Sequence, residues 1–359
     1  MSRLWRNILI GVGLLVVVIA VLVVRTLNAA GAFDEVKEVA AGTCKTIGNL
    51  AGSEDLQIDR QTQTLFVSSA DFRTLSAGKS SSQDGVYAMS PDHPELGLHK
   101  LAGTPADFHP HGISLYRAPD GVLTLMAVNH PGGFKPSTVE IFEVSDSATG
   151  PTLNHVGSVK GDLLYRPNDL VAVGKDRFYA TNDHGSHSGI GMTLENYLML
   201  PRASVVYYDG SVFHTVAQDL VFANGINISP DRSHIYVAET TGGVVKTYSR
   251  DAIGGTLTLQ SELAVARGPD NIDVDESGNL WVASHPKIFK LVARGSDPSA
   301  LSPSQISKVT VAGGIPVSAA TIYANLGEEV SGSSVGVTFA GHLYIGTVYG
   351  PGVLDCALK

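Results

Sequence analysis

Clusters of basic residues are absent from this chain of 359 residues, which carries a net charge of −9 with its Asp and Glu residues spread along its length. Nucleic-acid binding requires a concentrated basic surface, so this class of function is excluded. Long helical periodicity is also absent from most of the chain, whereas turn residues are frequent, with 39 Gly and 17 Pro. This composition predicts one all-β domain rather than two α/β domains.

Long apolar runs are absent too, apart from Ile8–Val24, which is flanked by Arg3, Arg6 and Arg25. Signal-peptide apolar regions have about 7–15 residues and membrane-spanning helices about 20, so this segment lies between the two. We interpret residues 1–25 as a retained signal-anchor and residues 26–43 as a tether. The alternative is cleavage at the small residues 30–32, which would give a secreted protein. The basic residues hold the amino end in the cytoplasm, so residues 44–359 are expected outside it, in a periplasmic, luminal or extracellular compartment.

The remaining chain contains a repeat. Six times, a pair of residues precedes an alternating apolar strand, a turn and a second apolar strand, at intervals of 46 to 63 residues. Several short strands per repeat are typical of a β-propeller, in which equivalent positions surround one central axis. The sequence therefore predicts an all-β, six-bladed β-propeller with a central channel. The six pairs are Glu54–Asp55, His111–Gly112, Asn168–Asp169, Asn224–Gly225, Asp270–Asn271 and Ser333–Ser334.

Most of these pairs carry carboxylate or amide side chains, and a propeller would bring them together at its axis. Asn and Asp are also common turn residues, which is the simpler interpretation of any single pair. Their recurrence at the same two offsets before the innermost strand favours a shared role. Hard oxygen donors without a thiolate are the ligands that Ca²⁺ prefers. The predicted ligands are Glu54, Asp55, Asn168, Asp169, Asn224, Asp270 and Asn271.

Histidines and a further aspartate are expected at the same end of the channel. If each innermost strand starts at one end, the antiparallel second strand returns to that end. This geometry places His130, Asp183 and His285 beside His111, which belongs to the ring itself. Each histidine alone is more often a surface or hydrogen-bonded residue. Several of them together beside a cation favour a hydrolytic site.

Cysteine is scarce, with only Cys44 and Cys356. Two isolated cysteines can be simple buried fillers. A propeller, however, closes by joining its first and last strands, and these two residues stand at the two ends of the repeat region. An oxidising compartment permits a disulfide there, which stabilises the fold by at most about 4–5 kcal/mol.

Two other motifs suggest different chemistry, a serine nucleophile and a zinc site. Gly332–Gly336 matches the G-x-S-x-G nucleophile pattern, but that motif needs a strand-to-helix turn in an α/β sheet and here opens an apolar strand. His109 and His111, with His130 or His184, suggest zinc, although the H-E-x-x-H pattern is missing and the surrounding acids and amides favour a harder ion. We treat both as chance matches.

Several segments together resemble the paraoxonase/arylesterase family, in order from about Cys44 to Cys356. The segments are His109–Ser114, Val128–Pro131, Ser137–Phe142, Pro167–Gly174, Tyr179–His184, Phe222–Asp231, Asp270–Ile272 and His285–Pro286. Similarity is loose at Asp71–Asp84 and at Ser188–Pro201, stretches that shape the substrate pocket. The identity of the substrate is therefore the least defined part of the resemblance.

The resemblance implies a six-bladed propeller with two calcium ions that hydrolyses lactones and aryl esters and, in some members, organophosphates. It also implies the terminal disulfide Cys44–Cys356 and a retained apolar amino terminus. It assigns a catalytic calcium to Glu54, Asn168, Asn224, Asp270 and Asn271, and a structural calcium to Asp55, Asp169 and the carbonyl of Ile113. It assigns a histidine dyad to His111 and His130, and further site residues to Asp183, His285 and Phe222.

Two alternatives stay open. One is a non-catalytic, calcium-stabilised propeller that binds a partner or resembles strictosidine synthase. The other is a gluconolactonase-type propeller, which performs related chemistry on a similar fold. The expected partners are a small lactone or ester substrate and, through the amino-terminal segment, a membrane, with no nucleic acid.

Overall fold

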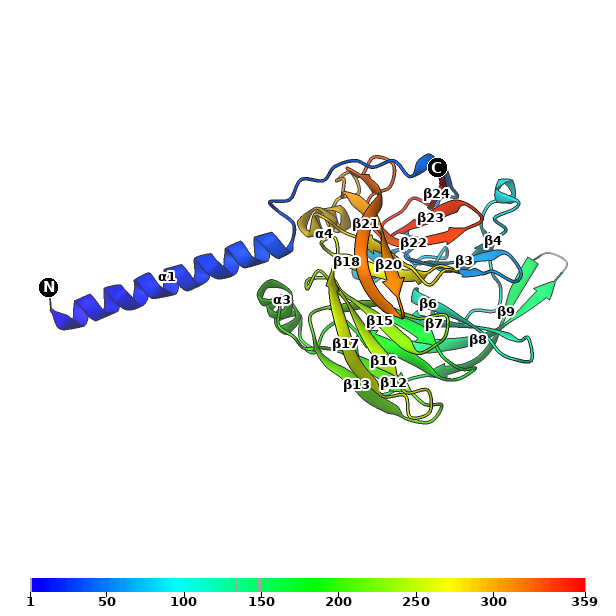
Figure 1. Ribbon diagram of the computed structural model, residues 1–359, viewed down its shortest axis with the longest axis horizontal. Helices are drawn as coiled ribbons and strands as arrows, with labels where there is room; N and C mark the ends of the chain where they lie inside the picture. Colours follow the sequence, from blue (N-terminus) through cyan, green and yellow to red (C-terminus); the bar gives the residue numbers. More distant parts are fainter. Residues whose placement is uncertain (1, 133–134, 148–149, 359) are drawn as a thin grey trace.

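The strands of the protein form six four-stranded antiparallel sheets arranged in a ring, as the computed structural model shows (Figure 1). The structure describes residues 2–132, 135–147 and 150–358. The innermost strands of neighbouring blades contact one another around the whole channel. The predicted six-bladed β-propeller is therefore confirmed.

Within each blade the strands follow one another from the channel outward. Blade 1 contains β2 (Asp55–Asp59), β3 (Thr64–Ser69), β4 (Gly85–Met89) and β5 (His99–Lys100), and blade 2 contains β6 (Pro110–Arg117), β7 (Leu123–Asn129), β8 (Thr138–Ser147) and β9 (Gly150–Val159). Blade 3 contains β10 (Pro167–Ala172), β11 (Phe178–Asn182), β12 (Ala203–Tyr208) and β13 (Phe213–Leu220), and blade 4 contains β14 (Ala223–Ile228), β15 (His234–Glu239), β16 (Val244–Arg250) and β17 (Leu257–Ala264). Blade 5 contains β18 (Pro269–Val274), β19 (Leu280–Ser284), β20 (Ser304–Ala312) and β21 (Ile315–Asn325), and blade 6 contains β22 (Ser333–Phe339), β23 (His342–Thr347), β24 (Val353–Leu358) and β1 (Gly42–Ile47).

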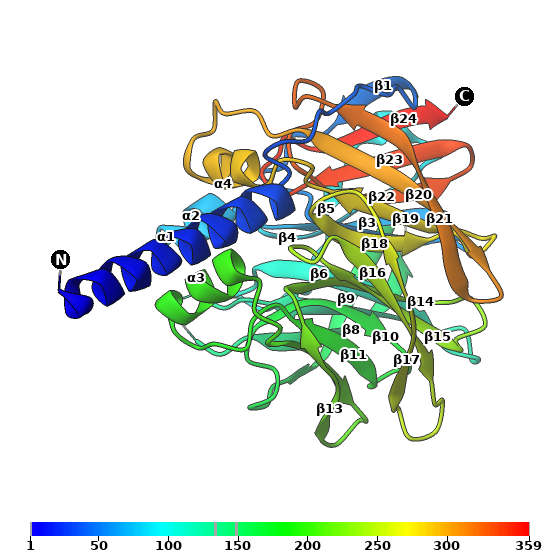
Figure 2. The ribbon, with the colours of Figure 1, turned by 60° about the vertical axis from the view of Figure 1, so that its left-hand side comes forward.

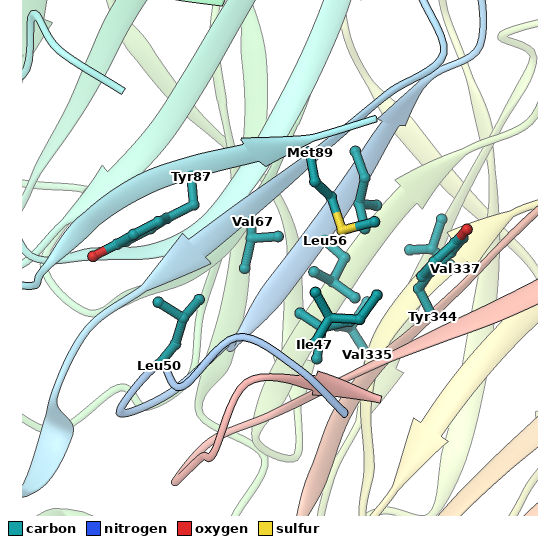
Figure 3. Close-up of a cluster of buried hydrophobic side chains, with 11 residues drawn as sticks. Ile47, Leu50, Leu56, Val67, Tyr87, Met89, Val335, Val337 and Tyr344 are labelled. Atoms are coloured by element: carbon teal, nitrogen blue, oxygen red, sulfur yellow. The ribbon is translucent and has the colours of Figure 1, made fainter. Parts of the chain in front are cut away.

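Blade 6 closes the ring because its outermost strand comes from the other end of the repeat region. Strand β1 pairs antiparallel with β24, and Cys44 lies opposite Cys356 in the register. These two residues form a disulfide that joins positions 312 residues apart. An apolar cluster also fills the seam between blades 1 and 6, with Leu56 and Val67 packed near Val335 and Val337 (Figure 3). The predicted closure and its disulfide are confirmed.

Four of the six pairs sit in β-bulges. In blades 2 to 5, both residues of the pair oppose a single residue of the next strand, so the register shifts at that point. A bulge leaves backbone groups unpaired and turns side chains out of the regular alternation. Three of these bulges directly follow a proline, namely Pro110, Pro167 and Pro269, which cannot donate to the ladder. The bulge is the local structure that aims the repeated pairs into the channel.

Three short helices lie at the same end of the channel as these bulges. They are α2 (Phe72–Ser76), α3 (Gly189–Leu198) and α4 (Ile288–Ser296), and a 3₁₀ turn, η1, covers Pro94–Leu96. We call this end of the channel the helical mouth. Helix α2 contacts α4, and α3 contacts the amino-terminal helix α1 (Arg3–Ala29), which projects away from the propeller (Figures 1 and 2).

Helix α1 is long and apolar enough to cross a membrane, and none of it is buried against the propeller. It continues four residues beyond the expected end of the anchor at residue 25. The tether that follows is held to the propeller rather than free. The carbonyl of Ala30 accepts the Ile288 N–H at 3.1 Å, and Val39 exchanges two backbone hydrogen bonds with Ala324. Gly31 is buried with a φ of +68°, and a Cβ there would lie 2.0 Å from the Pro286 carbonyl oxygen.

Candidate functional site

Five of the seven predicted oxygen ligands line the helical mouth as buried side chains. Glu54 directly precedes β2, and the others lie in the bulges of blades 3, 4 and 5. Each is at most 5% exposed, although all five are polar. Buried polar groups are costly unless they are paired, so the partners of their oxygens decide what the site can do. These five residues are Glu54, Asn168, Asn224, Asp270 and Asn271.

Four of these residues each keep one buried oxygen with no hydrogen-bond partner among the described residues. The unpaired atoms are Glu54 Oε2, Asn168 Oδ1, Asn224 Oδ1 and Asn271 Oδ1. A buried acceptor left without a donor costs on the order of 1–3 kcal/mol, so four from one ring of equivalent positions need an explanation. A bound cation supplies it because a cation attracts oxygen lone pairs and needs no proton.

The amide nitrogens show how two of these oxygens are oriented. The Asn224 side-chain nitrogen donates to Thr240 Oγ1 at 3.0 Å, and Thr240 in turn donates to the Pro269 carbonyl at 2.8 Å. The Asn271 side-chain nitrogen donates to Glu54 Oε1 at 3.0 Å and to the Glu54 carbonyl at 3.2 Å. With the nitrogens occupied by protein acceptors, the oxygens are left for a ligand.

Asp55 and Asp169 form an inner pair of carboxylates, at most 4% exposed. Each accepts two backbone N–H groups, one from its own blade and one from the next bulge: Asp55 from Leu56 and Ile113, and Asp169 from Leu170 and Ile226. Glycine at position 112 is required here, because a Cβ would lie 2.2 Å from Asp169 Oδ1. The structure therefore involves Ile113 through its N–H, and the predicted role of its carbonyl stays a prediction.

Burial raises the pKa of both inner carboxyls, and their mutual repulsion and the charge of Glu54 raise the pKa of Asp55 further. The backbone N–H groups offset only part of this rise. Two buried acids so close together are stable in their charged form only beside a positive charge. The inner pair therefore also fits a cation.

The predicted histidine dyad is present as a hydrogen-bonded pair. His111 Nδ1 lies 3.1 Å from His130 Nε2, and His111 Nε2 lies 3.5 Å from Glu54 Oε1. Burial lowers the pKa of His111, but Glu54, followed by Asp270 and Asp183, raises it above the ordinary value overall. Burial and the neighbouring His111 lower the pKa of His130 to about 3. The lowered pKa favours the neutral form of His130, and its hydrogen bond to His111 fits the predicted pairing of the two imidazoles.

The other predicted residues lie around this centre. His285 Nε2 is 2.7 Å from Asp270 Oδ2, and both side chains are buried. Asp183 Oδ1 is 2.7 Å from His184 Nδ1 and 3.4 Å from Arg166 Nε. Burial raises the pKa of Asp183, yet His184 and Arg166 lower it overall, so this carboxylate is ionised. Phe222 packs its ring against His184 at 4.9 Å between centroids.

Several neighbours of these residues are absent from the sequence prediction. Ser137 lies 3.0 Å from His130 Nδ1, and Phe72 of α2 packs on His111 with 5.1 Å between ring centroids. His184 bridges Asp183 to Asn196 of α3. Only the contacts in the folded chain reveal these roles.

The donor atoms distinguish a hard-ion site from the two alternatives, a zinc site and a serine nucleophile. Within the described ranges, no three His, Cys, Asp or Glu side chains are placed to share a metal ion. A cation site here must therefore include amide oxygens, which suit a hard ion such as Ca²⁺ better than zinc. Ser334 of the G-x-S-x-G match is fully buried in β22, so it is no exposed nucleophile.

Known proteins resemble the chain over nearly its whole length. The family model described as Arylesterase matches residues 35–358. Human serum paraoxonase/arylesterase 2 is 36% identical over 351 residues, which is 95% of this chain and 97% of the relative. Human serum paraoxonase/arylesterase 1 is 35% identical, covering 89% of this chain and 90% of the relative. Among solved structures, a calcium-binding protein, regucalcin, from Agrobacterium tumefaciens shares the fold, with a TM-score of 0.53, 13% identity and coverage of 90% of this chain and 96% of that one. The chain therefore belongs to the arylesterase family, as its sequence motifs indicate.

Proposed function

We propose that this protein is a calcium-dependent hydrolase of lactones and aryl esters, with organophosphates as a secondary substrate class. One observation supports the proposal most: four unpaired buried oxygens from four blades meet at the mouth that also holds the His111–His130 pair. Human paraoxonase/arylesterase relatives and a calcium-binding propeller of the same fold add to it.

The cation at the mouth would be held by the side chains of Glu54, Asn168, Asn224, Asp270 and Asn271. Two of these are carboxylates, so they balance the charge of a divalent ion. When bound, calcium polarises a carbonyl oxygen and stabilises the negative charge that grows on it. A second calcium would be held by Asp55, Asp169 and the Ile113 carbonyl, where it neutralises the inner carboxylates.

The protein's own residues prepare the attacking water. His111 would accept a proton from that water, because its imidazole lies at the edge of the site and the neighbouring carboxylates of Glu54, Asp270 and Asp183 raise its pKa and make it a stronger base. His130 fixes the orientation of His111 through the 3.1 Å hydrogen bond and is itself oriented by Ser137. Asp183 and His285 are the alternative bases, since both lie at the same mouth.

Phe222 would form part of the pocket wall that positions the substrate. Its backbone adopts a φ of +56°, a conformation that side-chain-bearing residues seldom take. Its ring also packs on His184, beside the ionised Asp183. A rigid aromatic surface at this position suits an aryl or alkyl substituent of an ester.

A non-catalytic propeller is the weaker alternative. A scaffold needs a buried ion at the inner carboxylates, but it does not need a second set of unpaired oxygens at the helical mouth or a histidine pair beside them. The gluconolactonase alternative explains the fold without explaining the terminal disulfide or helix α1.

The amino-terminal segment would keep the enzyme at a membrane with its propeller outside the cytoplasm. The apolar helix and the disulfide fit a secreted or membrane-anchored protein. The buried positions of Ala30 and Gly31 fit a retained segment, because both residues belong to the tether that docks on the propeller.

A substrate panel tests the proposed function. The full chain, purified in detergent, is assayed with an aryl acetate, a γ-lactone and an aryl phosphotriester, with calcium present. We expect turnover of the first two classes, loss of activity in Asp270→Ala, and unchanged activity after treatment with a serine-directed inhibitor. An inactive wild-type chain, or a covalent adduct on Ser334, would refute the proposal.

A further inference from the structure

His109 is a buried imidazole with no part in the proposed reaction. Its side chain is 3% exposed and lies between two carboxylates, with Nδ1 2.7 Å from Asp84 Oδ2 and Nε2 3.2 Å from Asp107 Oδ1. Both ring nitrogens thus lie within hydrogen-bond distance of a carboxylate oxygen. The backbone of His109 also touches the dyad, because its carbonyl accepts the His130 N–H at 3.1 Å.

His109, Asp84 and Asp107 form a cluster, and Asp84 connects it to His111 through the first residues of helix α2. Asp84 Oδ1 accepts the backbone N–H of Asp71 at 2.9 Å. Asp71 caps helix α2, since its carboxylate accepts the Thr74 N–H at 3.0 Å and the Thr74 hydroxyl at 2.6 Å. The first residue of α2 is Phe72, whose ring packs on His111. Asp84 therefore fixes the aromatic wall of the catalytic imidazole.

Asp107 connects the same cluster to His130 through the segment that precedes Ser137. Asp107 Oδ1 accepts the Gly132 N–H at 3.1 Å, and Oδ2 accepts Lys135 Nζ at 2.5 Å. Both residues precede Ser137 in the connection between β7 and β8, and the Ser137 hydroxyl lies 3.0 Å from His130 Nδ1. Asp107 therefore fixes the partner of the second imidazole.

We propose that His109 is a positioning residue whose two carboxylate partners, Asp84 and Asp107, hold separate walls of the histidine dyad, and that Phe72 is a specificity-determining residue held in place through Asp84. This inference rests on the proposed hydrolytic function. Hydrogen bonds to carboxylates are strong in a buried setting, which applies to the His109–Asp84 contact, whereas Asp107 is 39% exposed and holds its wall through several contacts instead. A displacement of about 1 Å near reacting atoms changes rates by up to roughly a hundredfold.

Double-mutant cycles in the full chain distinguish the effect of Asp84 from that of Asp107. For each variant, kcat and KM are measured for an aryl acetate and a γ-lactone. Asp84→Asn keeps the shape but removes the charge, and we expect it to change the ratio of the two kcat/KM values by roughly tenfold. The same change in a Phe72→Ala background should have no further effect on that ratio, because the aromatic ring that Asp84 positions is already absent.

Asp107→Asn should instead lower kcat for both substrates by a similar factor and should add nothing to Ser137→Ala. The crossed pairs, Asp84→Asn with Ser137→Ala and Asp107→Asn with Phe72→Ala, should be additive and serve as internal controls. Asp355→Asn is the matched control for losing a buried carboxylate: it pairs with His342 between β23 and β24, away from the mouth, and should leave the substrate ratio unchanged.

Additive effects of Asp84→Asn and Phe72→Ala, or a substrate ratio in Asp84→Asn no different from that in Asp355→Asn, would overturn the inference while leaving the proposed function standing. If Asp84→Asn does not fold, Asp71→Ala interrupts the same connection one step closer to α2, with the same expected result. An inactive wild-type chain would refute the proposed function itself.

Discussion

Asn271 donates a hydrogen bond from its side-chain nitrogen to Glu54 Oε1 at 3.0 Å, and this contact joins blade 5 to blade 1 at the helical mouth. It leaves Asn271 Oδ1 and Glu54 Oε2 as buried acceptors to which no described residue donates. The amide is thus oriented by the protein so that its oxygen, and not its nitrogen, faces the proposed cation. The same holds for Asn224, which is oriented by Thr240.

We expect the outer and inner ligands to differ in their effect on stability. Asn224→Ala should lower kcat for a lactone by on the order of a hundredfold with little change in melting temperature, because it removes a ligand at the open mouth. Asp169→Ala should lower the melting temperature by roughly 5–15 °C, because it leaves Asp55 buried without its cation. Calorimetry and initial rates on both variants decide this, and equal losses of stability would contradict two distinct sites.

The histidine dyad should raise the rate without being indispensable, unlike the carboxylate ligand Asp270. His111→Gln should reduce kcat by about 10²–10⁴-fold and remove the limb of the pH–rate profile that belongs to the base. Asp270→Ala should abolish turnover in the same assay. His130→Gln is the matched comparison, since it keeps a hydrogen-bonding side chain beside His111. A His111→Gln variant with an unchanged pH profile would transfer the role of base to Asp183 or His285.

Without divalent cations the stability of the protein should decrease as the pH rises. Burial raises the pKa of Asp169 to about 8 from an ordinary 3.8, so the folded chain binds this proton more tightly than the unfolded chain does. The resulting stabilisation is complete below the unfolded pKa and is lost as the pH rises through the folded value. Melting temperatures of the chelated protein should therefore fall between about pH 4 and pH 8, and added calcium should remove this fall. The same pH dependence with and without calcium would show that the inner carboxyls do not bind it.

The tether should remain part of the mature chain, and its contact with the propeller should depend on Gly31. Gly31→Ala should loosen the contact of the tether with Pro286, because it strains a φ of +68° and brings a Cβ onto a carbonyl oxygen. Gly97→Ala is the control, with a φ of +73° and no atom within 4 Å of the added carbon. Hydrogen exchange at Ile288, whose N–H bonds to Ala30, should accelerate in the first variant only. Mass spectrometry should find an intact amino terminus, whereas a mature chain starting near residue 31 would rule out the anchor.

Much of the fold could be predicted from the sequence because its signals are local and repeated. Alternating apolar strands and a polar pair at regular intervals indicate six blades, and the placement of Cys44 and Cys356 indicates how they close. The β-bulges are not visible in this pattern. A bulge differs from a regular strand by one unpaired residue, and only the register of the neighbouring strand shows it.

The candidate site could be located from the sequence, but its supports could not. Repeated positions identify Asn224 and Asn271 as members of the ring, yet their orientation depends on Thr240 and Glu54, which are distant in the chain. His109 shows the limit most clearly. As a member of an H-P-H motif it suggests a metal ligand, whereas the structure pairs both of its ring nitrogens with carboxylates.

The most direct measurement is the lactonase activity of one preparation before calcium is removed, after it is removed with a chelator, and after it is restored. The account predicts that activity falls at least a hundredfold on chelation and returns with calcium but not with magnesium, whose preference for a compact six-oxygen shell does not suit carboxylate and amide ligands from four blades. Full activity in the chelated protein, with its calcium content verified as zero, would contradict the account.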